Sequence, residues 1–403
     1  MPKFVKAFNL LNVTRGSTSP AYAHTTDRMP IYYYDADDYD QVSGIFFTAS
    51  LSAGTGGGNV AYMELYNFTD STSVTGSEIS TTSTTLVSVT SGDIEVNMTT
   101  AKEYLTRWKQ DDGAGGTPSN NCSFNKATIL IKQDGAITKT RTDIELGEDN
   151  DVPSTSYTAP TNYGIFLFES ARFDGTVTVY LEAVLRCQSS GDTTYGALYD
   201  ITAAAQVSSS EVSHTGNTTK TRKRSGAITL VDGHEYRPDI KGTATNDDVA
   251  SVSIIIKQTG TPTKTDCYIP ILNTSSSGTG STYAYQNRYL DFDDSDYDGD
   301  TKTFKYEATL NSSAGNTAYY NLYNDTDTTE LAVVTATSAT YVRSRDDTVT
   351  MPTDDNNVLN SGRKIDTAGT VSAGRSFLIA QMDWSPVAEG STYPSWNWGG
   401  GGW

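Results

Sequence analysis

Apolar and polar residues alternate with a period of two through much of the chain, which is the pattern of half-buried β-strands. Three such runs each pass through a Gly- or Ser-rich turn into a second run that contains a Leu-Tyr pair. The first runs are residues 45–51, 177–185 and 304–310, and the Leu-Tyr stretches are 61–70, 194–202 and 318–327. Leu-Tyr followed by Asn or Asp and Thr is typical of a strand that enters a polar turn.

The Leu-Tyr stretches belong to a longer internal repeat. Two copies continue with Ser-Glu-Ile-Ser at 77–80 and Ser-Glu-Val-Ser at 210–213, and a long alternating run follows in every copy. Each copy closes on an apolar strand that ends in glutamine, at Gln133, Gln258 and Gln381, and these are 125 and 123 positions apart. Spacing this regular indicates tandem duplication.

The size of the repeat predicts the domain organisation. About eight strands in ~125 residues is the strand number and length of a β-sandwich, here of jelly-roll type. We therefore predict an all-β chain of three tandem, jelly-roll-like β-sandwich domains. Their predicted bounds are 1–136, 137–261 and 262–384, followed by a Gly- and Trp-rich C-terminal tail over 385–403.

Composition supports this fold and narrows the classes of function. Of the 403 residues, 25 are Tyr and 34 are Gly, and only 19% are charged, which suits strands and turns better than helices. The formal net charge of −19 argues against a nucleic-acid partner, because phosphates would be repelled. A solvated acidic surface explains the charge, and cation binding is the other explanation.

The cysteines and the N-terminus indicate where the chain folds. Cys122, Cys187 and Cys267 cannot all pair within one chain and lack metal-ligand spacing, so we expect free thiols in a reducing compartment. Residues 1–12 lack the apolar segment and cleavage site of a secretory signal, and no stretch approaches the ~20 apolar residues of a membrane span. We expect folding in the cytosol without export.

No arrangement of nucleophile and base stands out. His24, His214 and His234 lie at unrelated positions of the repeat, in turn-like or polar contexts. Glu78 and Glu211 occupy matching positions, but one carboxylate in each of two domains is typical of a strand-end or turn-capping group. We therefore predict no catalytic residues and no enzymatic activity.

The sharpest local motif is an acidic loop in the third copy. Its alternate aspartates resemble the first half of a calcium loop, in which oxygens converge on a hard cation, but the closing Glu is replaced by Lys305. One interpretation is a Ca²⁺ site, with no other cofactor expected, and the other is a solvated acidic turn. The candidate ligands are Asp294, Asp296, Asp298 and Asp300.

A basic run at 220–224 places Lys220, Arg222 and Arg224 on one face of a strand. On so acidic a chain, a contact between domains or subunits explains this run better than nucleic-acid binding. A solvated face is the simplest alternative.

A run of tyrosines in the first copy is a candidate glycan-binding surface, because exposed aromatic rings can stack on sugars. Neighbouring residues of a strand face opposite sides, so only some of the rings can be exposed. We take Tyr32 and Tyr34 as the candidates, with packing in the core or in an interface as the alternative.

The C-terminal tail holds three of the five tryptophans in a glycine-rich segment that cannot form its own core. Aromatic residues on a tether either cover a neighbouring surface or anchor into a partner, and the alternative is a frayed terminus. The candidate anchors are Tyr393, Trp396, Trp398 and Trp403.

The Leu-Tyr-Asn-x-Thr-Asp, Ser-Glu-Ile/Val-Ser and Ile-Lys-Gln repeats and the Thr-, Gly- and Tyr-rich composition resemble virion surface proteins of tailed bacteriophages, such as head fibres, decoration proteins or tail-associated proteins. This resemblance of style spans the full length and transfers no functional residues. It implies a homo-oligomeric structural subunit that folds in the host cytosol and then lies on a virion or extracellular filament, in contact with other proteins of that assembly. The alternative is a cell-surface adhesin or S-layer-like protein that binds a surface glycan.

Overall fold

The computed structural model of this chain contains β-strands and four single-turn 3₁₀ helices in its described residues. The strands pair antiparallel into six five-stranded sheets, two in each third of the chain. This confirms the predicted all-β fold of three sandwiches. The described residues are 1–11, 15–17, 19–23, 30–55, 58–118, 120–149, 152, 154–216, 218–244, 248–272, 276–286, 288–313, 315–354, 357–366 and 369–385.

The first sandwich pairs a sheet of order β1-β10-β4-β8, with β2 beside β10, and a sheet of order β3-β9-β5-β6, with β7 beside β5. Several strands that the sequence pattern missed have only two or three residues. The elements are β1 (Lys3–Leu11), β2 (Arg15–Ser17), β3 (Tyr32–Tyr34), η1 (Ala36–Asp38), β4 (Val42–Ser52), β5 (Val60–Asn67), β6 (Thr72–Ser73), β7 (Ile79–Thr81), β8 (Val87–Thr90), η2 (Glu95–Asn97), β9 (Lys102–Asp111) and β10 (Cys122–Asp134).

The second sandwich repeats this plan, with sheets of order β12-β11-β20-β14-β18 and β13-β19-β15-β16, and with β17 beside β15. Its elements are β11 (Lys139–Asp149), β12 (Asn162–Tyr163), β13 (Phe166–Leu167), η3 (Ser170–Arg172), β14 (Thr176–Arg186), β15 (Thr193–Asp200), β16 (Ala205–Gln206), β17 (Val212–Thr215), β18 (Thr221–Arg224), β19 (Glu235–Gly242) and β20 (Asp248–Thr259).

The third sandwich has sheets of order β21-β30-β25-β28, with β22 beside β30, and β23-β29-β26-β27, with β24 beside β29. Its elements are β21 (Lys264–Leu272), β22 (Ser276–Gly278), β23 (Ala284–Tyr285), β24 (Leu290–Phe292), η4 (Asp294–Asp296), β25 (Thr301–Ser312), β26 (Ala318–Asn324), β27 (Thr329–Ala336), β28 (Val342–Val349), β29 (Asn357–Ile365) and β30 (Val371–Asp383).

The Leu-Tyr motif places a leucine in the core of each sandwich. Leu65, Leu198 and Leu322 are fully buried on β5, β15 and β26. In the first copy the hydroxyl of Ser77 accepts from the backbone N–H of Leu65 and donates to the carbonyl of Val74. Ser210 makes the same two bonds to Leu198 and Val207. The repeated motif is therefore a packing device that ties a turn to the central strand.

The repeated glutamine fixes the linkers between sandwiches. The side-chain amide of Gln133 donates to the carbonyls of Asp40 and Lys139. The amide of Gln258 does the same with the carbonyls of Asp174 and Lys264 in the second copy. Each glutamine thus ties the end of one sandwich to the first strand residue of the next, Lys139 or Lys264.

The strand register corrects the third glutamine of the sequence alignment. The equivalent residue in each copy is the one that lies opposite the second residue of that sandwich's first strand. Gln133, Gln258 and Met382 lie opposite Phe4, Thr140 and Thr265. The sequence alignment chose Gln381, which is one position away, because the sequence alone does not show which residue lies opposite on the neighbouring strand.

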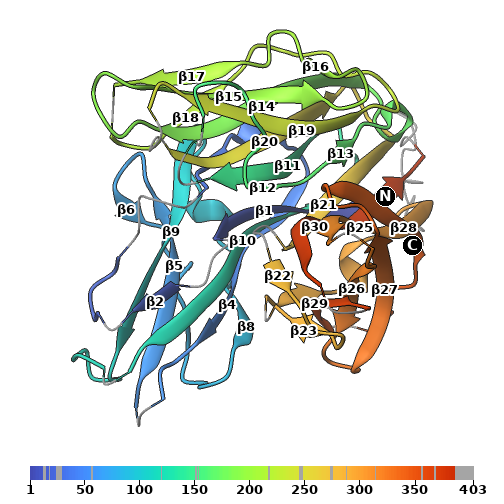
Figure 1. The fold of residues 1–403 in the computed structure, drawn as a ribbon. Coiled ribbons are helices and arrows are strands. Elements are labelled where there is room, and N and C mark those ends of the chain that lie inside the picture. Colours follow the sequence, from blue (N-terminus) through green and yellow to red (C-terminus); the bar gives the residue numbers. More distant parts are fainter. Residues whose placement is uncertain are drawn as a thin grey trace, which may run out of the picture.

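The three sandwiches are grouped like the corners of a triangle, with the first strand of each, β1, β11 and β21, toward the middle (Figure 1). The hydrophobic cores extend across this junction. Phe4, Val5 and Ala7 of β1 belong to the core of the third sandwich, and Tyr268 and Phe377 of the third belong to that of the second. Packing between sandwiches is therefore continuous with packing inside them.

The three cysteines are free, as predicted, and all are buried. Within the described residues, no helix is long and apolar enough to cross a membrane.

Candidate functional site: the junction of the three sandwiches

Three 3₁₀ helices occupy equivalent places in the three sandwiches, and each docks on the first sheet of another sandwich. Helix η1 of the first lies against the second, η3 of the second against the third, and η4 of the third against the first. The last residue of each helix makes the contact: Asp38, Arg172 and Asp296. The contacts close a ring, and we call its three interfaces the first, second and third seams.

The first seam is a buried arginine–carboxylate cluster. Arg141 is fully buried on β11, and its guanidinium lies 3.1 Å from the carboxylate of Asp38 and 2.6 Å from that of Asp143. Lys257 also binds Asp38. Burial opposes the charged form of Arg141, but the surrounding acidic groups, of which Asp143 contributes most, together outweigh it and raise the pKa of the guanidinium. The guanidinium therefore keeps its charge.

The second seam has the opposite polarity. Here the base is on the helix, because Arg172 takes the place of Asp38, and the acid is on the sheet, because Asp266 takes the place of Arg141. The guanidinium of Arg172 lies 3.0 Å from the carboxylates of both Asp266 and Asp383.

The third seam returns to acid on the helix. The carboxylate of Asp296 lies 2.6 Å from Nζ of Lys132 and 3.8 Å from Nζ of Lys3. The main chain adds a bridge, since Lys3 and Asp298 exchange two N–H to carbonyl hydrogen bonds of 2.8 Å. This seam has no covalent linker, so side-chain and backbone contacts alone close the ring.

The four aspartates of the predicted calcium loop are placed in and beside the third seam. Asp296 binds lysines of the first sandwich, and the carboxylate of Asp294 lies 2.7 Å from Nζ of Lys302. Asp300 accepts hydrogen bonds from Ser385, and Asp298 pairs with Lys3 through the backbone. In the part of the chain that the structure describes, no three His, Cys, Asp or Glu side chains are grouped closely enough to hold a metal ion. Calcium binding stays a prediction, and a cation there would compete with these ammonium groups.

A second row of ion pairs crosses two of the seams and explains the basic strand. Arg222 on β18 lies 3.3 Å from Glu103 of the first sandwich and 2.6 Å from Glu182. The equivalent Arg343 on β28 lies 3.6 Å from Glu235 of the second sandwich. The basic run is therefore a contact between sandwiches, and its arginines are largely buried rather than solvated.

The third seam lacks this pair. The strand registers place Ser88 where the other copies have Arg222 and Arg343, and Val358 where they have Glu103 and Glu235. A groove of about 670 Å³ lies there instead, between β8 of the first sandwich and the second sheet of the third. A neighbouring groove of about 480 Å³ shares Ser88, Asp291 and Val358 with it.

Lys6 lies where the three first strands meet. It is 1% exposed, and its ammonium group donates to the hydroxyl of Thr142 at 2.7 Å, the hydroxyl of Thr265 at 3.0 Å and the carbonyl of Asp266 at 2.9 Å. Three donors therefore meet three acceptors, which satisfies the buried ammonium group. Burial lowers the pKa of Lys6.

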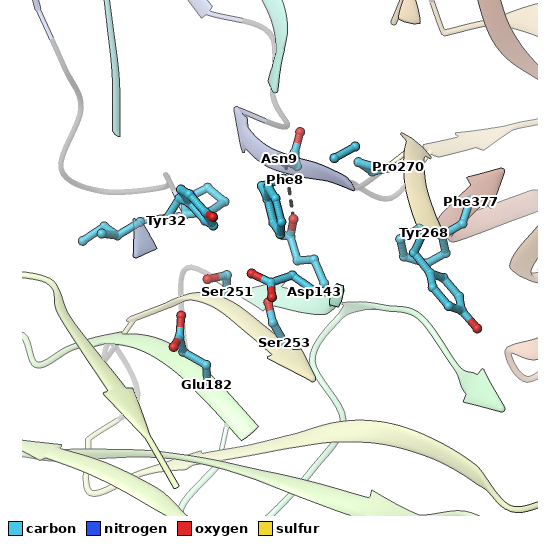
Figure 2. Close-up of a pocket in the computed structure, with 14 residues that line it drawn as sticks. Phe8, Asn9, Tyr32, Asp143, Glu182, Ser251, Ser253, Tyr268, Pro270 and Phe377 are labelled. Carbon is cyan, nitrogen blue, oxygen red and sulfur yellow. Dashed lines mark hydrogen bonds between the residues drawn. The ribbon is translucent and has the colours of Figure 1, made fainter. Parts of the chain in front are cut away.

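A cavity of about 40 Å³ lies beside this point and is lined by all three sandwiches. Figure 2 shows Phe8 and Asn9 on one side, Asp143, Glu182, Ser251 and Ser253 below them, and Tyr268 and Phe377 to the right. Its three carboxylates are bound by arginines: Asp143 by Arg141, Glu145 by Arg375 and Glu182 by Arg222. The cavity has room for a few water molecules, and its Glu145–Arg375 pair joins the second sandwich to the third.

Lys126 of β10 is a buried base at the third seam, 4% exposed, whose ammonium group donates to the carbonyl of Pro270. Burial, with a smaller contribution from the charge of Arg288, lowers its pKa to about 7, and Asp291 acts in the opposite direction. A lysine in the unfolded chain titrates near 10.5. Between these two values the unfolded chain binds more protons at this site, so this group makes stability rise with pH.

We predict that Lys126→Met removes this pH dependence. Between pH 7 and pH 8.5 the wild-type protein should gain up to about 2 kcal/mol of unfolding free energy relative to the variant. Urea denaturation at a series of pH values measures it. Lys102→Met is the control, because Lys102 is half-exposed in its pair with Asp70 and should leave the slope unchanged. Parallel curves for wild type and Lys126→Met would contradict the prediction.

The two candidate glycan residues are core residues in the structure. Tyr32 and Tyr34 are 4% and 5% exposed. Tyr32 stacks on Phe8 at 4.5 Å between ring centroids, and Tyr34 stacks on Tyr39 at 6.3 Å. The packing alternative is therefore the one observed, because the inward face of β3 covers the hydrophobic core. Neither ring has an open face for a sugar.

The remaining residues singled out from the sequence have structural partners or fall outside the description. Glu78 and Glu211 accept hydrogen bonds from Tyr22 and Tyr157. His234 binds Asp200 at 2.7 Å. His24 and the tail residues Tyr393, Trp396, Trp398 and Trp403 lie outside the described residues.

Searches of the sequence against protein-family models and curated proteins find no match. Among solved structures, the fold is similar to the VP2 subviral particle of infectious bursal disease virus, with 10% identity and a TM-score of 0.22 over 61% of this chain and 72% of that chain. It is also similar to a triple jelly roll protein of an archaeal virus, with 8% identity and a TM-score of 0.21 over 93% and 91%. The PBSX exported protein XepA has 7% identity and a TM-score of 0.18 over 59% and 86%. Similarity at this level carries no argument about this chain.

Proposed function

We propose that the chain is a non-enzymatic structural subunit of a virion or extracellular filament. The observation that carries the proposal is the closed ring of seams, in which buried ion pairs and the Lys6 junction fix three sandwiches relative to one another. A subunit whose parts are already fixed loses little further freedom when it assembles. Rigid, repeated sandwiches are therefore suited to building a shell or a fibre.

In its finer form, the proposal is a surface protein of a bacteriophage virion that folds in the host cytosol. Its sandwiches contact other copies and other virion proteins, and the tail residues Tyr393, Trp396, Trp398 and Trp403 anchor in a neighbouring subunit. Large aromatic side chains supply much of the binding energy at such contacts, and assemblies of identical chains are mostly symmetric.

Sedimentation velocity and electron microscopy of the purified protein test this proposal. We expect full-length protein to form oligomers of defined size as its concentration rises, and protein truncated after Ser385 to stay monomeric. A variant with Trp396, Trp398 and Trp403 changed to alanine should behave like the truncation, since it keeps the length of the tail and removes its aromatic rings.

Monomers at every concentration, together with no binding to purified particles, would contradict assembly. That outcome would favour the alternative function, a cell-surface adhesin or S-layer-like carbohydrate-binding protein. Oligomers that still form in the tail variants would support the structural role and show that assembly does not need the tail.

A further inference from the structure

The groove at the third seam has a composition unlike the rest of the junction. Leu86, Val87 and Ser88 form one wall, and the other wall carries two tyrosines, two aspartates and an asparagine. The residues that line the second wall are Tyr285, Tyr289, Asp291, Asp325, Thr326, Val358 and Asn360. The volume of the groove, about 670 Å³, is in the range of small-molecule sites.

The aromatic part of this groove is open to solvent. Tyr285 is 37% exposed and is the only aromatic residue among the exposed large apolar residues of the described chain. The ring is also held in place, because it packs on Tyr323 at 4.7 Å and on Tyr283 at 6.3 Å between centroids. A fixed ring with a free portion can stack on a ligand at little entropic cost.

Polar groups line the same groove. The amide of Asn360 donates to the carboxylate of Asp325 at 3.2 Å, and Thr90 donates to the carboxylate of Asp291 at 3.1 Å. Each carboxylate can accept several more hydrogen bonds. The hydroxyl oxygen of Ser88 is buried and has no partner among the described residues.

The chemistry of the lining selects one class of ligand. Two carboxylates and no basic side chain among the described lining residues repel anions. A purely apolar ligand would displace water from the remaining acceptor sites of the two carboxylates without replacing its hydrogen bonds, which is costly. A sugar has an apolar C–H face for the tyrosine and hydroxyl donors for the carboxylates, so it satisfies both kinds of group.

We propose that the groove at the third seam is a binding site for a neutral saccharide, with Tyr285 as the stacking platform and Asp291, Asp325 and Asn360 as hydrogen-bonding partners. The proposal does not depend on the assembly proposed above. It moves the predicted glycan site from Tyr32 and Tyr34, which are buried, to the seam where Ser88 and Val358 replace an ion pair.

The test uses the full chain and a panel of neutral probes: the methyl glycosides of glucose, galactose, mannose and N-acetylglucosamine, and the disaccharides maltose, cellobiose and lactose. Saturation-transfer NMR detects binding, and calorimetric titration measures it. We expect at least one probe to bind saturably, and Tyr285→Ala to weaken that binding about tenfold or more. Tyr319→Ala is the control, because Tyr319 packs under Lys364 outside the groove and should change the affinity less than twofold.

A second variant separates loss of the site from loss of folding. Ser88→Arg combined with Val358→Glu installs the pair found at the other two seams, fills the groove and should abolish saccharide binding without lowering the melting temperature. Binding that survives both this variant and Tyr285→Ala would overturn the proposal. It would also be overturned if no probe binds, or if tetramethylammonium binds more tightly than every saccharide, which would assign the groove to a cation.

Discussion

Arg141→Ala is expected to lower the free energy of unfolding by about 3–5 kcal/mol, because it removes the partner of two carboxylates that stay behind at the first seam. Arg141 is fully buried, and both nitrogens of one edge of its guanidinium bind Asp143 at 2.6 and 2.7 Å. A further nitrogen binds Asp38 and the carbonyl of Tyr33. Chemical denaturation followed by tryptophan fluorescence measures the loss.

The control is Lys102→Ala, which removes a surface ion pair within the first sandwich. Lys102 and Asp70 are 26% and 40% exposed, so solvent screens the pair and its loss should cost no more than about 1 kcal/mol. If both variants lose the same small amount, the first seam does not contribute to stability as its burial implies.

The second large effect is expected from exchanging the charges of the second seam. Arg172→Asp and Asp266→Arg, each alone, should cost about 3–5 kcal/mol, because each places like charges together in a buried contact. The double variant should regain about 2–3 kcal/mol as coupling between the two positions. It reproduces the polarity of the first seam, where Asp38 lies on the helix and Arg141 on the sheet.

A double-mutant cycle from denaturation curves gives the coupling energy. If the stability loss of the double variant equals the sum of the two single losses, the two residues do not act as a pair. Asp383 should limit the recovery, because it also binds Arg172 and would face the new aspartate. Removing it in an Asp383→Asn background should raise the recovery, whereas Asp70→Asn, far from the seam, should leave it unchanged.

The charges at the seams differ in sign: an acid lies on the helix at the first and third seams, and a base at the second. Asp38 attracts the basic sheet of the second sandwich, whereas Arg172 would be repelled by it and fits the acidic edge of the third. Mismatched docking that involves the helix or the sheet of the second seam therefore places like charges together. Opposite charges at equivalent positions discriminate between sandwiches that are otherwise closely similar in architecture.

Much of the fold follows from local pattern. The period-two runs predicted the long strands, including β4, β14 and β25, and the Leu-Tyr repeats predicted the central strands β5, β15 and β26. Short strands such as β6 and β16 were missed because two residues carry no periodicity. The position of the third glutamine was also missed, because register depends on the strand opposite.

Less of the candidate site could be predicted from the sequence. The acidic loop, the basic strand and the tyrosines were each recognised, but the sequence alone did not show that Asp296 binds Lys132, that Arg222 binds Glu103 or that Tyr32 is buried. One signal was present: aligning the copies places Asp38, Arg172 and Asp296 at one position, and a change of charge at an aligned position indicates a contact that differs between copies.

The sequence by itself therefore determined a threefold repeat of β-sandwiches, because alternation and turn residues act on neighbours along the chain. Only the tertiary structure decided which charges meet across the three seams and that the third seam stays open beside Tyr285. These contacts join residues that are far apart in sequence, such as Lys3 and Asp298. Their energies depend on burial and distance, which no local pattern records.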